Sequence, residues 1–71
     1  MRFSRHALQQ MARRGITAEE VDEALANRET SYAGRPGNRV VVLGRTRGGR
    51  RLKVVMAGDV VVTAADRDEW P

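Results

Sequence analysis

Three short apolar runs, rich in β-branched residues and separated by glycine-containing turns, constrain this chain more than any other feature. The middle run covers residues 51–57, with Gly48-Gly49 before it and Gly58-Asp59 after it. Because two-residue turns of this kind join neighbouring antiparallel strands, we expect residues 39–45, 51–57 and 60–65 to form a meander. A small sheet has one face to bury, and only the N-terminal third of the chain is available to cover it.

That N-terminal third carries start signals for two helices. Ser4 is a suitable N-cap for a helix over residues 5–14. Thr17 and Glu20 have the spacing of a capping box, which predicts a second helix over residues 18–27. We expect the helices to form a tight hairpin whose inner side chains include Leu8, Met11, Val21 and Leu25.

The predicted two-residue turns also determine which side chains share a face of the sheet. The bulkier face, expected to meet the helices, holds Val41, Leu43, Leu52, Val54, Met56, Val61 and Thr63. The other face holds Val40, Val42, Lys53, Val55, Ala57, Val60 and Val62. Because this second set is still strongly apolar, four of its valines are predicted to form a protein interface: Val40, Val42, Val55 and Val62.

The composition indicates one small cytoplasmic domain over residues 1–71. The chain has no cysteine, which excludes disulfides and thiolate zinc sites and fits a reducing compartment. Residues 2–6 are basic with no apolar stretch behind them, unlike a signal peptide. No apolar run approaches the ~20 residues that a spanning helix needs, so we expect no membrane partner.

Basic residues are concentrated in the second half of the chain. From Arg35 to Lys53 there are seven Arg or Lys residues and no acidic one, whereas four carboxylates lie between Glu19 and Glu23. Such a basic segment is typical of proteins that bind nucleic acid or an acidic protein. The alternative is that the charge only keeps a small protein in solution.

Metal-free cleavage of RNA needs a group that accepts the 2′-hydroxyl proton and cations that hold the phosphate. His6 is the only imidazole of the chain and is the candidate for proton transfer, with bracing of the helix start as the alternative. Arg51 and Lys53 are the candidates for holding phosphate, with protection of a sheet edge as the alternative. Further candidates for RNA contacts are Arg14, Arg45, Arg47, Arg50 and Arg67.

No cofactor and no metal are expected. The carboxylates Glu19, Asp22 and Glu23 share a helix face, but the positive end of the helix explains acidic residues there without a metal. No glycine-rich nucleotide loop and no Ser/His/Asp arrangement can be identified in the sequence.

The opening of the chain resembles that of a bacterial family of small domains of unknown function. The matching residues are Phe3-Ser4-Arg5-His6-Ala7-Leu8, Met11, Arg14-Gly15-Ile16-Thr17 and Glu20-Val21. The strand region is similar too, through Gly49-Arg50-Arg51-Leu52-Lys53-Val54-Val55 and Val61-Val62-Thr63. The family usually has Arg where this chain has Gln10, which removes a cation from the helix stripe that holds His6.

The resemblance implies an α+β fold like that of the RelE/ParE toxins. An N-terminal helical hairpin would pack on one face of a three- to four-stranded antiparallel sheet, with residues 30–33 as the candidate fourth strand. The function implied is a toxin-like domain that engages RNA or the ribosome, in its catalytic form a metal-independent endoribonuclease, with a small acidic antitoxin-like partner. The alternative is a non-catalytic module that binds a protein, or a second copy as a homodimer, through the apolar sheet face.

Overall fold

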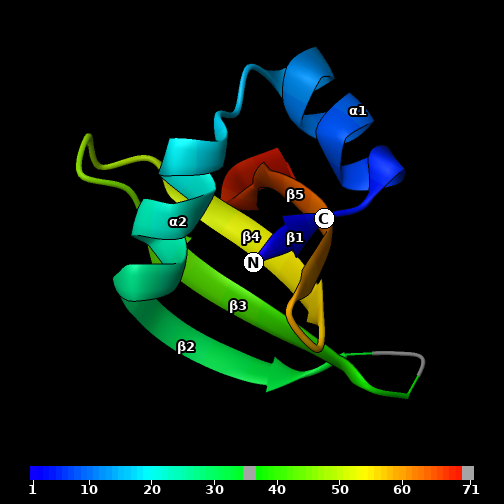
Figure 1. The fold of residues 1–71 in the computed structure, drawn as a ribbon. Coiled ribbons are helices and arrows are strands. Elements are labelled where there is room, and N and C mark those ends of the chain that lie inside the picture. The colour runs from blue at the N-terminus through cyan, green and yellow to red at the C-terminus, as the bar shows by residue number, and fades with distance from the viewer. Residues whose placement is uncertain (35–36, 70–71) are drawn as a thin grey trace.

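The fold is α+β: two helices come first in the chain and lie on one face of a five-stranded mixed sheet (Figure 1). The structure, a computed structural model, describes residues 1–34 and 37–69. The elements are β1 (Arg2–Phe3), α1 (Arg5–Arg14), α2 (Ala18–Ala26), β2 (Arg28–Ala33), β3 (Arg39–Arg45), β4 (Arg51–Ala57), β5 (Val60–Asp66) and a 3-10 helix η1 (Arg67–Glu69). The sheet is larger than predicted because β1 and β2 extend it at both edges.

Local hydrogen bonds explain where the helices begin and end. The Ser4 hydroxyl accepts the N–H of Ala7 at 3.0 Å, and Gly15 closes α1 in the left-handed conformation with φ 67°. At the start of α2 the Thr17 N–H donates to Glu20 Oε1 and the Glu20 N–H donates to Thr17 Oγ1, both at 3.0 Å. This reciprocal pair is the capping box that the sequence indicates.

The meander forms the centre of the sheet. The strand order is β1-β5-β4-β3-β2, so β4 has two strands on either side. β1 runs parallel to β5, and the other neighbouring strands are antiparallel. The two edges differ in length, because β1 has two residues and β2 has six.

The connection between β3 and β4 corrects the predicted face of β3. Arg45 pairs with Arg51, so residues 46–50 join the strands instead of a two-residue turn. This moves β3 by one residue relative to β4 and exchanges its two faces. Val42 therefore lies opposite the buried Val54, on the face that the helices cover.

A bulge in β5 corrects a second part of the predicted pattern. Val55 pairs with Thr63 and Met56 pairs with Val61, which leaves Val62 as an extra residue between the two pairs. Thr63 consequently shares a face with Val55 and not with Val61. The four valines predicted to form one interface are divided among the face away from the helices, the helix side and the bulge: Val55; Val40 and Val42; and Val62.

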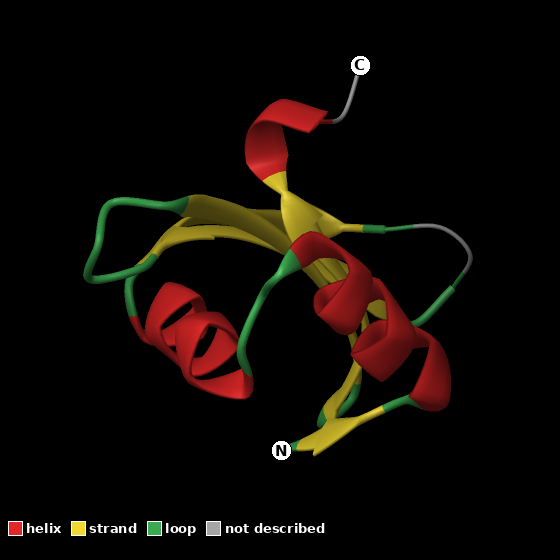
Figure 2. Cartoon of the chain, turned by 90° about the horizontal axis from the view of Figure 1, so that it is seen from above, coloured by secondary structure: helices red, strands yellow, loops and turns green. Residues whose placement is uncertain are grey.

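The two helices cover the same face of the sheet but lie apart from one another, as Figure 2 shows. α1 lies mainly against β5, and α2 lies against β3 and β4. The predicted tight hairpin is therefore wrong, because each helix packs on a different part of the sheet. The predicted core residue Leu8 is 51% exposed, and Ala7 and Met11 of the same helix are buried instead.

One glycine determines how closely α2 approaches the sheet. A Cβ added to Gly44 of β3 would lie 1.9 Å from the carbonyl oxygen of Ala24 in α2. Only glycine fits this contact, because no other residue lacks a Cβ. The core beside it is built from small and medium-sized side chains: Ala7, Met11, Ile16, Val21, Ala24, Leu52, Val54, Val61 and Ala64.

Candidate nucleic-acid interface

The sheet face turned away from the helices, here called the open face, is formed at its centre by alternate residues of β3 and β4. Leu52 and Val54 of β4 are fully buried under the helices, so the residues between them point to the opposite side. The register places the β3 residues opposite their β4 partners on this face. Four of the open-face residues on these two strands are basic: Arg39, Arg45, Arg51 and Lys53.

Two of these basic residues, Arg45 and Arg51, lie directly opposite one another. Like charges at opposed positions destabilise a sheet. Glu29 offsets part of this repulsion, because its carboxylate binds Arg45 Nη2 at 3.3 Å and Arg67 Nη1 at 3.1 Å. A concentration of charge that costs stability is typical of a surface with a function.

A hollow of about 370 Å³ lies on the open face. Val41 is almost fully buried at 6% exposure, whereas Tyr32 is 49% exposed. Of the described residues that line the hollow, two are basic and none is acidic: Tyr32, Ala33, Gly34, Arg39, Val41, Lys53, Val55 and Thr63. Its volume and its mixture of apolar and polar groups are those of small-ligand sites.

The predicted catalytic trio does not come together. Lys53 and Arg51 belong to the open face, whereas His6 is an exposed residue in the first turn of α1, on the helix side of the sheet. The sheet therefore separates the imidazole from the two cations. A single phosphate cannot touch all three groups, so this constellation is wrong.

Arg50, predicted to contact RNA, is occupied by the protein itself. Its guanidinium binds the Asp66 carboxylate in a fork, Nε to Oδ1 at 2.6 Å and Nη2 to Oδ2 at 2.9 Å. It also donates to the backbone oxygens of Gly15 at 2.9 Å and Arg14 at 3.0 Å, and to Glu20 at 3.3 Å. We therefore withdraw Arg50 from the predicted RNA contacts.

The contacts of Arg50 change the acid–base properties of the groups involved. The hydrogen bond to Asp66, followed by the nearby negative charge, raises the pKa of the Arg50 guanidinium above its ordinary value. The backbone hydrogen bond from Thr17, with the charge of Arg50, lowers the pKa of the Glu20 carboxyl below 4.5. One arginine thus links the end of α1, the start of α2, β4 and the end of β5.

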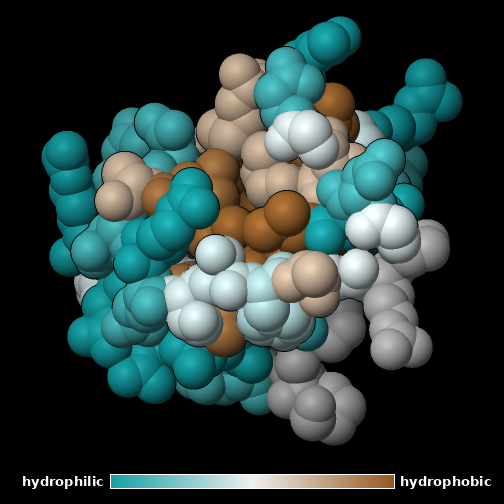
Figure 3. Space-filling view, turned by 90° about the horizontal axis from the view of Figure 1, so that it is seen from below, coloured by the Kyte–Doolittle hydropathy of each residue, from teal (hydrophilic) through white to brown (hydrophobic). Residues whose placement is uncertain are grey.

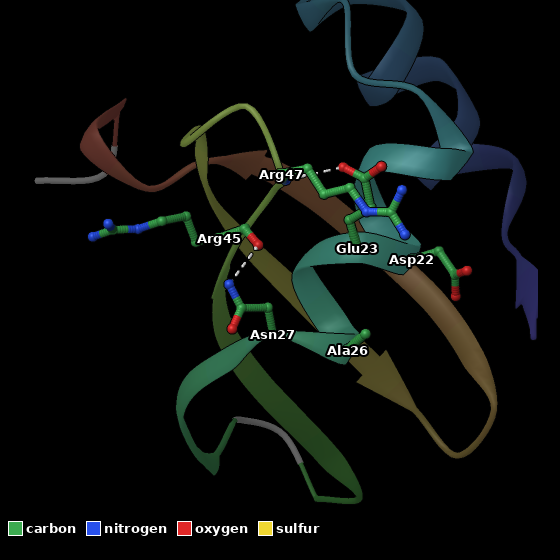
Figure 4. Close-up of a pocket in the computed structure, with 6 residues that line it drawn as sticks. All are labelled: Asp22, Glu23, Ala26, Asn27, Arg45 and Arg47. Atoms are coloured by element: carbon green, nitrogen blue, oxygen red, sulfur yellow. Dashed lines mark hydrogen bonds between the residues drawn. The ribbon is translucent and has the colours of Figure 1, made fainter.

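A second hollow, of about 290 Å³, lies between α2 and the residues at the end of β3 (Figure 4). The Arg47 N–H donates to Glu23 Oε1 at 3.1 Å, and Asn27 Nδ2 donates to the backbone oxygen of Arg45 at 3.4 Å. Figure 4 shows the Arg47 side chain beside Glu23, with Asp22 on the same helix. Acidic and basic groups compensate each other here, so we interpret this hollow as part of the attachment of the β3–β4 connection to α2.

The remaining predicted contacts lie in different places. Arg14 is half-buried on the helix side, where its Nη1 lies 3.5 Å from the Ala64 backbone oxygen. Arg67 follows β5 in η1 and reaches Glu29 of β2. The prediction omitted Arg39, although its alternation with Arg45 along β3 would have indicated a shared face once the register was known.

Among residues 1–34 and 37–69, no group of three or more His, Asp or Glu side chains could hold a metal ion. No helix in the described part of the chain has the length and hydrophobicity to cross a membrane. A protein-family model matches residues 3–70, and its description is a domain of unknown function, DUF4258. No curated protein and no solved structure matches the chain.

Proposed function

We propose that this chain, which belongs to the DUF4258 family of domains of unknown function, binds single-stranded RNA on the open face of its sheet. The observation that carries the proposal is the set of basic side chains that β3 and β4 place together on this face, with Arg45 and Arg51 directly opposed. Lys and Arg bind RNA chiefly through its phosphates, and release of counterions from the backbone supplies much of the affinity.

The hollow next to these cations favours an unpaired strand over a duplex. Tyr32 is exposed at the hollow, and Val41 and Val55 give it an apolar lining. An aromatic ring can stack on a base that has left its own stack, whereas the bases of a duplex are already stacked on each other. In this proposal Lys53 and Arg39 hold phosphates on either side of one base in the hollow.

The proposal contains no cleavage step. His6, the only imidazole of the chain, lies on the other side of the sheet from Lys53 and Arg51. The function that the geometry supports is therefore binding.

The test is a fluorescence anisotropy titration of a labelled RNA of about a dozen nucleotides, a length within the range that small single-strand-binding domains cover. An Arg51→Ala/Lys53→Ala variant should lose affinity at least tenfold, and its slope of log affinity against log salt should flatten by about 0.7 for each lost contact. The matched control is Arg5→Ala/Arg13→Ala, which removes the same charge from exposed positions of α1.

Three outcomes decide the matter. A large loss confined to the open-face variant supports the proposal. Equal losses in both variants would show that affinity follows net charge alone, and an absence of RNA binding at low salt would overturn the proposal. Tyr32→Ala should weaken binding of a single strand, and Tyr32→Phe should retain it, because the ring and not the hydroxyl stacks on the base.

A narrower form of the proposal is a toxin-like domain of RelE/ParE type, for which the ribosome supplies the RNA and a small acidic antitoxin-like protein covers the basic face. The helix-first α+β order and the charge of the open face support this form. In a cell-free translation assay, added protein should lower the yield, and the Arg51→Ala/Lys53→Ala variant should not. Unchanged translation would restrict the proposal to binding of other RNA.

A further inference from the structure

One edge of the sheet is long and open. β2 lies at the end of the strand order, and all six of its residues are exposed. The other edge strand, β1, has only two residues. An exposed edge strand presents unpaired backbone N–H and C=O groups to any other extended chain.

The hydrogen bonds of the β2–β3 hairpin show which backbone groups point outward. The Gly34 N–H donates to the Arg39 oxygen at 2.8 Å, so Gly34 turns its backbone groups toward β3. In an antiparallel pair this direction alternates, which places the groups of Tyr32 on the inner side as well. Ser31 and Ala33 therefore direct their N–H and C=O groups away from the sheet.

The features that usually prevent pairing at an edge are missing from this part of β2. Proline, lysine and bulges are the common protections. β2 contains neither proline nor lysine. Its bulge lies between Arg28 and Thr30, before the outward-facing residues, so the segment that follows is regular.

We propose that a second copy of this chain pairs antiparallel with β2, with Ser31 on the two-fold axis. This register joins residues whose backbone groups both face outward, Ser31 with its own copy and Ala33 with Glu29. It places Thr30 opposite Tyr32, a β-branched residue against an aromatic one, which is a favourable cross-strand pair. The charged residues Arg28 and Glu29 fall opposite the uncharged end of the other strand, so no like charges meet.

Apolar surface beside the edge strengthens the argument for a partner. Val40 of β3 is 41% exposed on the helix side, opposite Met56. Seen from below, where β2 lies lowest in Figure 1, apolar side chains gather in a hollow with hydrophilic side chains around it (Figure 3). A second copy paired on β2 lies next to this surface and shields it from water.

The pairing joins two five-stranded sheets into one and places the two open faces side by side. An interface built mainly on one strand is small, so the dimer is weak and its population depends on protein concentration. This inference is independent of RNA binding, because it concerns the edge of the sheet and requires no ligand.

Sedimentation velocity from low to high micromolar concentration tests the proposal. The wild-type chain should shift from monomer to dimer, and Ser31→Pro should remain monomeric. Proline is tolerated at an edge position whose N–H faces outward, so the fold should persist in this variant. Should it unfold, Ser31→Lys replaces it, because lysine guards natural edge strands without removing an N–H.

A disulfide trap tests the register. The chain has no cysteine, so Ser31→Cys introduces a single thiol on the proposed axis, and Arg13→Cys introduces one on an exposed position of α1 as the control. Ser31→Cys should form a covalent dimer at least ten times faster than Arg13→Cys under mild oxidation. A wild-type chain that stays monomeric, a dimer that survives Ser31→Pro or Ser31→Lys, or equal rates of cross-linking would each overturn the proposal.

Discussion

Arg50 and Asp66 form a two-pronged ion pair, with Nε 2.6 Å from Oδ1 and Nη2 2.9 Å from Oδ2. The two residues come from the start of β4 and the end of β5. The same guanidinium donates to the last carbonyl groups of α1, which have no partner within the helix. This one side chain therefore fixes the end of α1 to the sheet.

Arg50→Ala should lower the free energy of unfolding by about 2–4 kcal/mol, because it leaves Asp66 and the α1 carbonyls without their donor. Arg50→Lys should recover less than half of the loss, since an ammonium cannot form the fork. Urea denaturation followed by circular dichroism measures both changes. The control Arg51→Ala removes the neighbouring, exposed charge and should change stability by less than about 0.5 kcal/mol; an equal loss in the control would contradict the role of Arg50.

The lowered pKa of Glu20 predicts a dependence of stability on acid pH. A carboxyl whose pKa is lower in the folded state stabilises the fold above its unfolded pKa, and this contribution disappears as the pH falls through the folded value. The difference in unfolding free energy between the wild-type chain and Glu20→Gln should therefore shrink between about pH 5 and pH 3. Gln keeps the capping box possible, so the variant isolates the charge. A difference that stays constant over this range would show that Glu20 is not coupled to folding.

Gly44→Ala should destabilise the fold by about 3 kcal/mol or more, because the new methyl group would meet the Ala24 backbone and force α2 away from β3. Gly48→Ala is the matched control, since the nearest atom to its added Cβ is 3.9 Å away. Thermal unfolding of the two variants gives the comparison. A similar melting temperature for both would mean that α2 does not pack as closely as the structure shows.

His6→Ala should leave both the melting temperature and the RNA affinity unchanged. The side chain is exposed and belongs to the helix side, away from the open face. Surface substitutions of this kind stay within about 0.5 kcal/mol. The anisotropy titration described for Arg51 and Lys53 provides the measurement, and a clear loss of RNA affinity would show that the helix side takes part in binding.

Local signals were sufficient for the secondary structure, because each depends on residues close together in the chain. Ser4, Thr17 and Glu20 form their caps within three or four positions, so the sequence alone placed the starts of both helices. The apolar runs between glycine turns likewise indicated the three central strands. The concentration of basic charge between Arg35 and Lys53 was also visible, and with it the candidate class of ligand.

The arrangement of these elements depended on contacts that no local pattern contains. Arg50 reads as one more cation near a turn, and its use appears only when Asp66 and the end of α1 are close to it. The same holds for the faces of β3. Gly48-Gly49 indicated a two-residue turn, whereas residues 46–50 form the connection, and a shift of one residue sends every side chain of a strand to the opposite face. Tertiary packing therefore decided that Val42 is buried while Arg39 and Arg45 join Lys53 on the open face.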